Sequence, residues 1–171
     1  MRYLTMNAKT KNSDQVDFRT PKYLFEYIKS LYGEVQYDGA CFADGSDALA
    51  YPLRLEEPWP SGIIYSNPPF DDESIIKWIN KGYIHSRANK NNVHIMLIPN
   101  KLNHVKIQKK GFDYVDRIIF LGGRVDFKSE YSVKGGASRN GSVILIQDSR
   151  LEFFEKTYSF KLLSELKEEF N

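Results

Sequence analysis

Residues 62–74, GIIYSNPPFDDES, change from an apolar run to a proline-rich turn and then to acidic residues. The apolar run at 62–65 is typical of a short buried strand. The acidic and small residues at 71–74 favour the first turn of a helix. The Asn-Pro-Pro-Phe turn (residues 67–70) is therefore expected where a strand ends and a helix begins. In open α/β sheets, ligands bind at this carboxyl end of the strands.

The Asn-Pro-Pro-Phe turn combines stiffness with hydrogen-bond acceptors. Proline has a fixed φ and no backbone N–H, so Pro68 and Pro69 predict a rigid loop that presents carbonyl oxygens. Asn67 adds a side-chain acceptor, and Phe70 adds a flat apolar face. Such a site suits a planar group with an exocyclic amine: adenine, cytosine, guanine or a glutamine amide. The structural alternative is a stiff turn whose phenylalanine lies in the core.

Length and composition restrict the class of protein. The 171 residues fit one domain with a sizeable core, and a net charge of +2 permits nucleic-acid binding without requiring it. The single cysteine, Cys41, excludes an internal disulfide, and the three histidines lack metal-ligand spacing, so we expect no metal. No run reaches the ~20 apolar residues of a membrane span, and no signal-peptide block is seen. We therefore expect a cytoplasmic protein without a membrane partner.

Helical and strand patterns alternate along the chain. Thr20 and Pro21 are typical of a helix N-cap and first helical position, and Gly33 of a helix end. The alternation predicts an α/β fold whose sheet is mostly parallel, with a C-terminal antiparallel hairpin. Neither a Gly-x-Gly-x-x-Gly motif nor a P-loop is present, which weighs against nicotinamide enzymes and NTPases. We expect a flexible arm at 1–17, helices at 21–32, 72–86 and 101–110, strands at 35–38, 62–65, 93–99, 115–121 and 142–147, a loop at 128–141, and one or two helical segments at 151–171.

Four motifs occur in an order that resembles the phage-type, Dam-like DNA N6-adenine methyltransferases. They are DFRTP at 17–21, YDGAC at 37–41, SNPPF at 66–70 and GRVDF at 123–127. The resemblance covers residues 17 to about 147. It implies a compact, Rossmann-like class I methyltransferase core at 18–150, followed by a C-terminal helical segment. It also implies S-adenosylmethionine as cofactor, double-stranded DNA as substrate, and a host-cytoplasmic location if a phage encodes the protein.

The resemblance assigns catalytic roles to the Asn-Pro-Pro-Phe turn. The Asn67 side chain and the Pro68 carbonyl would accept hydrogen bonds from the adenine N6 amine, Phe70 would stack on the base, and Pro69 completes the motif. The base would first be flipped from the duplex, at a cost of a few kcal/mol. Because the amine lone pair is delocalised into the ring, two acceptors on its hydrogens favour a pyramidal, nucleophilic nitrogen. Catalysis would therefore depend on positioning and electrostatics rather than on a strong base.

The resemblance also implies a cofactor site. Thr20 and Pro21 match a motif near the methionine end of the cofactor, and Asp38 matches the acid that closes the first strand. The interval between Asp38 and Asn67 is too short for the two further strands that a full methyltransferase core has there. The implied cofactor-binding residues are Thr20, Pro21, Asp38, Gly39, Ala40, Cys41 and Asp47.

Contacts to DNA are expected from basic side chains, since no insert is large enough for a separate recognition domain. The lysine-rich segment at 101–110 and the loop at 128–141 would then determine which DNA sequence is recognised. A solvated helix face is the simpler interpretation of the lysines. The candidate phosphate contacts are Lys101, Lys106, Lys109, Lys110, Arg124 and Arg139.

Three alternatives remain open at the level of sequence. The same turn would also serve a methyltransferase that acts on RNA or on a protein glutamine. A degenerate, non-catalytic relative would instead bind nucleic acid or a host protein. The third alternative is an α/β scaffold of unrelated function.

Overall fold

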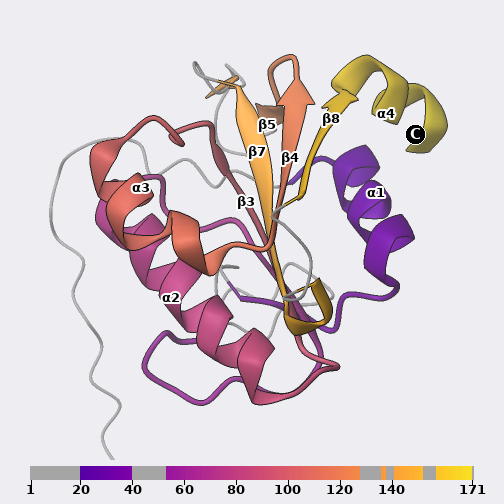
Figure 1. Cartoon of the computed structure of the whole chain (residues 1–171). Helices are drawn as coiled ribbons and strands as arrows, with labels where there is room; N and C mark the ends of the chain where they lie inside the picture. Colours follow the sequence, from indigo (N-terminus) through magenta and orange to yellow (C-terminus); the bar gives the residue numbers. More distant parts are fainter. Residues whose placement is uncertain (1–19, 40–52, 128–135, 138–140, 152–156, 171) are drawn as a thin grey trace, which may run out of the picture.

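The computed structural model describes residues 20–39, 53–127, 136–137, 141–151 and 157–170. Within these residues, two pairs of helices cover the two faces of a six-stranded sheet (Figure 1). One face carries α1 (Lys22–Tyr32) and α4 (Leu163–Phe170), and the other carries α2 (Asp72–Ala88) and α3 (Val105–Lys110). The strand order is β1 (Tyr37–Asp38), β2 (Ile63–Ser66), β3 (Val93–Pro99), β7 (Ser142–Asp148), β4 (Arg117–Gly122) and β8 (Thr157–Leu162).

The sheet is mixed, and most of its strands run in the same direction. β1, β2 and β3 pair in parallel, as do β4 and β8, whereas β7 is antiparallel to both of its neighbours. Between β4 and β7, the short strands β5 (Asp126–Phe127) and β6 (Gly136–Ala137) form a separate two-stranded sheet. The predicted α/β class, mostly parallel with an antiparallel pairing near the C-terminus, is confirmed. The carboxyl ends of β1, β2, β3 and β4 consequently lie at one end of the sheet.

The two central strands explain the strongest apolar runs in the sequence. Every residue of β3 and of β7 is buried, because both faces of the sheet are covered there. Side chains alternate between the faces: Ile95 and Leu97 pack in the cluster below α1 and α4, and Met96 packs in the cluster below α2 and α3.

Two helix starts differ from the prediction. Pro21 rather than Thr20 is the N-cap of α1, and its carbonyl oxygen accepts from the amides of Leu24 and Phe25. Thr20 is no cap because its hydroxyl is used in a tertiary contact described below. α3 begins only at Val105, so Lys101 lies in the connection that precedes the helix. As predicted, Gly33 ends α1 with a positive φ of 88°.

The C-terminal segment was expected to be helical, and for residues 157–162 this prediction is wrong. These residues form β8, which pairs in parallel with β4 along its whole length. Their composition, rich in aromatic and β-branched residues, is typical of strands, and β4 offers an edge for pairing. A helix, α4, follows only at Leu163. Residues 157–162 thus extend the main sheet.

Among the described residues, β1 is an edge strand of the sheet. In the described part of the chain no strand pairs with the outer side of β1, and β2 follows it directly in the sheet order. This agrees with the short interval between Asp38 and Asn67. No helix within the described residues has both the length and the apolar content that a membrane crossing requires.

Candidate active site

The carboxyl ends of β1 and β2 bring three of the predicted motifs together. Asp38, the last residue of β1, pairs with Tyr65 in β2, and the Gly39 amide donates to the Tyr65 carbonyl at 2.7 Å. Thr20 shares a 2.5 Å hydrogen bond between its hydroxyl and that of Tyr65. Asn67 follows β2 directly. Thr20, Asp38 and Asn67, which are distant in sequence, are therefore gathered around one tyrosine.

Tyr65 is a site residue that the sequence did not reveal. Its side chain is fully buried, and the ring of Phe25 lies edge-on at 5.6 Å. Burial, and next the negative charge of Asp38, raise the pKa of the Tyr65 hydroxyl well above its usual value. The hydroxyl therefore stays protonated and available to Thr20. In the sequence, Tyr65 is only the last residue of an apolar run, because nothing local indicates its partner 45 positions away.

The Asn-Pro-Pro-Phe turn is partly buried. Asn67 is half-buried, with its side-chain oxygen out of contact with solvent, while Pro68 is buried and Pro69 is exposed. Phe70 packs against the core cluster below α1 yet remains partly accessible. The core-phenylalanine alternative thus describes part of the Phe70 environment, and the residue as a whole is only partly buried.

Beyond the turn, α2 begins as its acidic residues predict. Asp71 is the N-cap, and its carboxylate accepts from the Ser74 amide at 2.8 Å. This hydrogen bonding to Ser74 lowers the pKa of Asp71. The chain direction after Phe70 is therefore fixed by a helix cap.

Lys101, in the connection that follows the neighbouring strand β3, holds the same region. Its ammonium group donates to the Phe70 carbonyl at 2.5 Å and to the Asp72 carboxylate at 3.0 Å. His104 adds its Nδ1 at 3.2 Å from both Asp72 oxygens. Hydrogen bonds from Lys101, and then from His104, lower the pKa of Asp72. The sequence suggests Lys101 as a phosphate contact and gives no sign of these partners.

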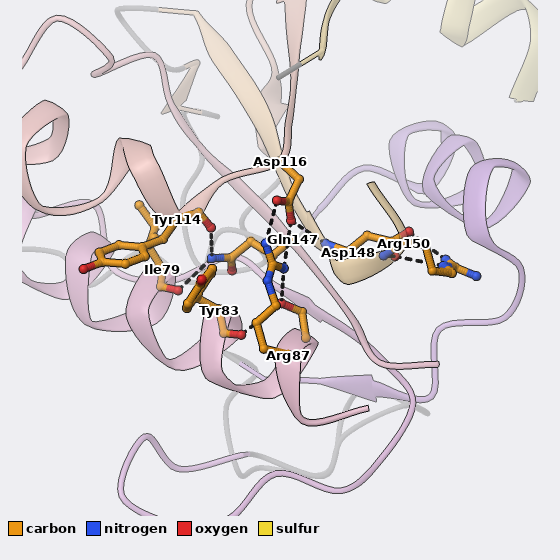
Figure 2. Close-up of polar contacts among 9 residues, drawn as sticks. Ile79, Tyr83, Arg87, Tyr114, Asp116, Gln147, Asp148 and Arg150 are labelled. Atoms are coloured by element: carbon orange, nitrogen blue, oxygen red, sulfur yellow. Dashed lines mark hydrogen bonds and ion pairs between the residues drawn. The ribbon is translucent and has the colours of Figure 1, made fainter. Parts of the chain in front are cut away.

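A buried polar chain supports the start of the turn. The Gln147 amide donates to the carbonyls of Ile79 and Tyr114, at 2.8 and 2.6 Å (Figure 2). The Gln147 side-chain oxygen must therefore accept from His94 Nδ1, at 2.8 Å. His94 Nε2 then accepts from the Ser66 hydroxyl, also at 2.8 Å. Burial lowers the pKa of the fully buried His94 to about 4, which keeps it neutral.

The comparison with known families agrees with this geometry. A family model described as DNA N-6-adenine-methyltransferase (Dam) matches residues 7–169, nearly the whole chain. The chain belongs to the Dam family. The match includes all four sequence motifs, covers β8 and extends into α4. It supports an enzyme that methylates adenine N6 in DNA. Among curated proteins, none is significantly similar to the chain.

The residues implied in cofactor binding by the Dam family fall into two groups. Thr20, Pro21, Asp38 and Gly39 lie in the described residues, at the start of α1 and the end of β1. Gly39 is buried, and a Cβ there would lie 2.9 Å from the Trp78 ring, so packing alone already requires a glycine. Ala40, Cys41 and Asp47 lie outside the described residues.

The basic residues proposed to contact DNA are more dispersed. Lys106, Lys109 and Lys110 are exposed on α3, which leads away from the carboxyl end of β3 towards the start of β4. Arg124 is exposed just after β4, at the same end of the sheet as Asn67, and Arg139 lies outside the described residues. No group of three His, Cys, Asp or Glu side chains is placed to hold a metal among the residues that the structure describes.

The opposite end of the sheet carries a structural ion-pair network (Figure 2). Arg87 binds Asp116 through two nitrogens, at 2.7 and 3.0 Å, and the Asp148 amide donates to the same carboxylate at 2.8 Å. Arg150 pairs with Asp148 at 2.7 Å. These contacts join α2 to the start of β4 and the end of β7, away from the Dam-family motifs.

Proposed function

We propose that the protein transfers a methyl group from S-adenosylmethionine to the N6 amine of adenine in double-stranded DNA. The observation that carries this proposal is the gathering of Thr20, Asp38 and the Asn-Pro-Pro-Phe turn at one end of the sheet. Membership of the Dam family supports the adenine N6 amine as the acceptor.

The base would bind at the Asn-Pro-Pro-Phe turn. The buried Asn67 oxygen and the Pro68 carbonyl would accept from the two amine hydrogens, because these are acceptors on a rigid backbone. The accessible part of Phe70 would stack on the adenine ring. Holding both hydrogens favours a pyramidal nitrogen, which restores the lone pair for attack. The acceptors are preorganised, so little reorganisation is needed during reaction.

The cofactor would bind beside β1. Thr20, Pro21, Asp38 and Gly39 are the described residues that would hold it, together with Ala40, Cys41 and Asp47. These residues fit the cofactor, because the negatively charged, half-buried Asp38 carboxylate suits a ligand with positive charge. The same negative charge contributes to the raised pKa of Tyr65. S-adenosylmethionine supplies, when bound, a methyl group activated by a positively charged sulfur. The residues of the chain would align the amine with that group.

DNA would be held through its phosphates by Lys106, Lys109, Lys110, Arg124 and Arg139. The target adenine would leave the base stack to reach the Asn-Pro-Pro-Phe turn, as in other enzymes that act on a base. The small net charge of the chain indicates that a few local cations, rather than a general positive field, would supply this binding.

The test uses S-adenosylmethionine labelled in its methyl group. The protein is incubated with double-stranded DNA, RNA and a mixture of proteins, and the labelled product is digested to nucleosides or amino acids. We expect label in DNA as N6-methyladenine. Label only in RNA or in protein glutamine would contradict the DNA assignment. DNA binding without any transfer would instead indicate the non-catalytic relative.

A further inference from the structure

The side chain of Lys101 is largely buried, whereas the lysines on α3 are exposed. The Lys101 side chain is only 18% exposed, and its ammonium group contacts the Phe70 carbonyl and the Asp72 carboxylate. It stands two residues after β3, the strand next to β2 in the sheet. A single cation therefore connects the loop after one strand with the turn after its neighbour.

The hydrogen bond to the Phe70 carbonyl fixes the end of the Asn-Pro-Pro-Phe turn. Pro68 and Pro69 have no N–H groups, so they cannot donate the backbone hydrogen bonds that normally fix a loop. A charge-assisted hydrogen bond to the Phe70 carbonyl replaces them and is stronger than a neutral one. Asp72 keeps the ammonium group in place, and His104 holds Asp72 from the other side.

We propose that Lys101 is a positioning residue, which fixes the Phe70 end of the Asn-Pro-Pro-Phe turn instead of binding a DNA phosphate. Ser66 and His94 hold the other end through their 2.8 Å hydrogen bond, so both ends of the turn are tied to the sheet. The catalytic part of this inference rests on the proposed function. Small displacements of aligned groups lower turnover strongly, which is why a residue that touches no substrate has a catalytic effect.

The first experiment separates positioning from phosphate binding. Lys101→Met removes the charge and keeps an unbranched side chain, and Lys77→Met makes the same change at an exposed position on α2 that has no part in the proposed DNA contacts. With Lys101→Met we expect kcat at saturating DNA to fall about tenfold or more, because the turn is displaced. The slope of DNA affinity against salt should stay unchanged. Lys77→Met should leave both kcat and the salt slope unchanged.

The opposite pattern would overturn the inference. If Lys101 contacts a phosphate, Lys101→Met keeps its kcat and lowers the salt slope by about 0.9. Lys101→Arg retains a cation, so the inference expects it to recover part of the turnover lost in Lys101→Met. Equal activity of all these variants would also overturn the proposal.

The second experiment does not depend on methyl transfer. Amide hydrogen exchange is followed at Asn67, Phe70 and Asp71 in the protein without DNA. Lys101→Met should speed exchange at these amides about tenfold or more, because the turn loses its anchor, while Lys77→Met should not change it. Unchanged exchange in Lys101→Met would contradict the positioning role. If the wild type fails to methylate DNA but Lys101→Met still exchanges faster than the wild type, the proposed function is rejected. The positioning role of Lys101 is then still supported.

Discussion

At the scale of single residues, Phe70 distinguishes a catalytic turn from a merely structural one. Phe70→Leu keeps an apolar side chain against the core but removes the flat ring. We expect methyl transfer to fall about tenfold, in line with the loss of one base-stacking contact. The free energy of unfolding should drop by less than about 1.5 kcal/mol, because the change nearly conserves volume. Activity assays and urea denaturation measure the two effects. A large stability loss with normal activity would identify Phe70 as a core residue only.

His94 predicts a pH dependence of stability. Burial, and to a small extent His85, lower its folded-state pKa to about 4, whereas an unfolded histidine titrates near 6.5. The unfolded chain therefore binds a proton first as pH falls, and stability is lost between about pH 6.5 and 4. From pH 7 to 5 the loss due to His94 should be about 2 kcal/mol.

The measurement is urea denaturation at pH 7 and pH 5, with His94→Gln as the comparison. Glutamine keeps hydrogen-bonding groups and does not titrate, so the variant should lose about 2 kcal/mol less than the wild type over this interval. The pKa of His85 is also lowered by burial, and its contribution remains in both proteins. An equal loss in the two proteins would show that His94 is protonated without cost.

At the scale of elements, Gly82 allows α2 to approach the sheet. A Cβ at Gly82 would overlap with His94 Nδ1 and with the Gln147 side-chain oxygen. In an ordinary helix, Gly→Ala stabilises by up to about 1 kcal/mol. Here the forced separation should outweigh that gain, giving a net loss of about 1–3 kcal/mol. Thermal denaturation of Gly82→Ala is compared with Asn80→Ala, a change on the exposed side of α2. A stabilised Gly82→Ala protein would contradict this packing.

The sequence indicates elements well where the signal is local. β3 and α2 follow from a nearly continuous apolar run and from an acidic helix start, both of which are properties of neighbouring residues. β8 was missed because its identity as a strand depends on pairing with β4, a partner distant in sequence. Tertiary pairing overrode the helical spacing that was read in the C-terminal segment.

The same distinction applies to the candidate site. The acceptor-rich turn was predictable, since proline restricts its own backbone and its neighbour. The contacts of Tyr65 with Thr20 and of Lys101 with Phe70 were not, because each joins segments that meet only in the folded sheet. The sequence therefore indicates what the turn offers to a ligand but not what holds it.

At the scale of the whole molecule, the described residues form a mixed α/β sheet that is consistent with a methyltransferase-like core. In the described residues the sheet stops at β1, yet the three motifs still meet at the carboxyl ends of β1 and β2. α1 and α4 pack together on one face, so the beginning and the end of the described chain support the same side of the site (Figure 1). The Dam-family match over residues 7–169 fits this arrangement, in which the C-terminal strand and helix belong to the core.

The most direct test of the account is methyl transfer to adenine by Asn67→Ala, measured beside the wild type and Asn80→Ala. We expect Asn67→Ala to lose transfer by about 100-fold or more, because an acceptor for the amine is removed from a preorganised site. Binding of S-adenosylmethionine and the melting temperature should stay close to those of the wild type, and Asn80→Ala should be fully active. Wild-type transfer by a folded Asn67→Ala protein would contradict the account.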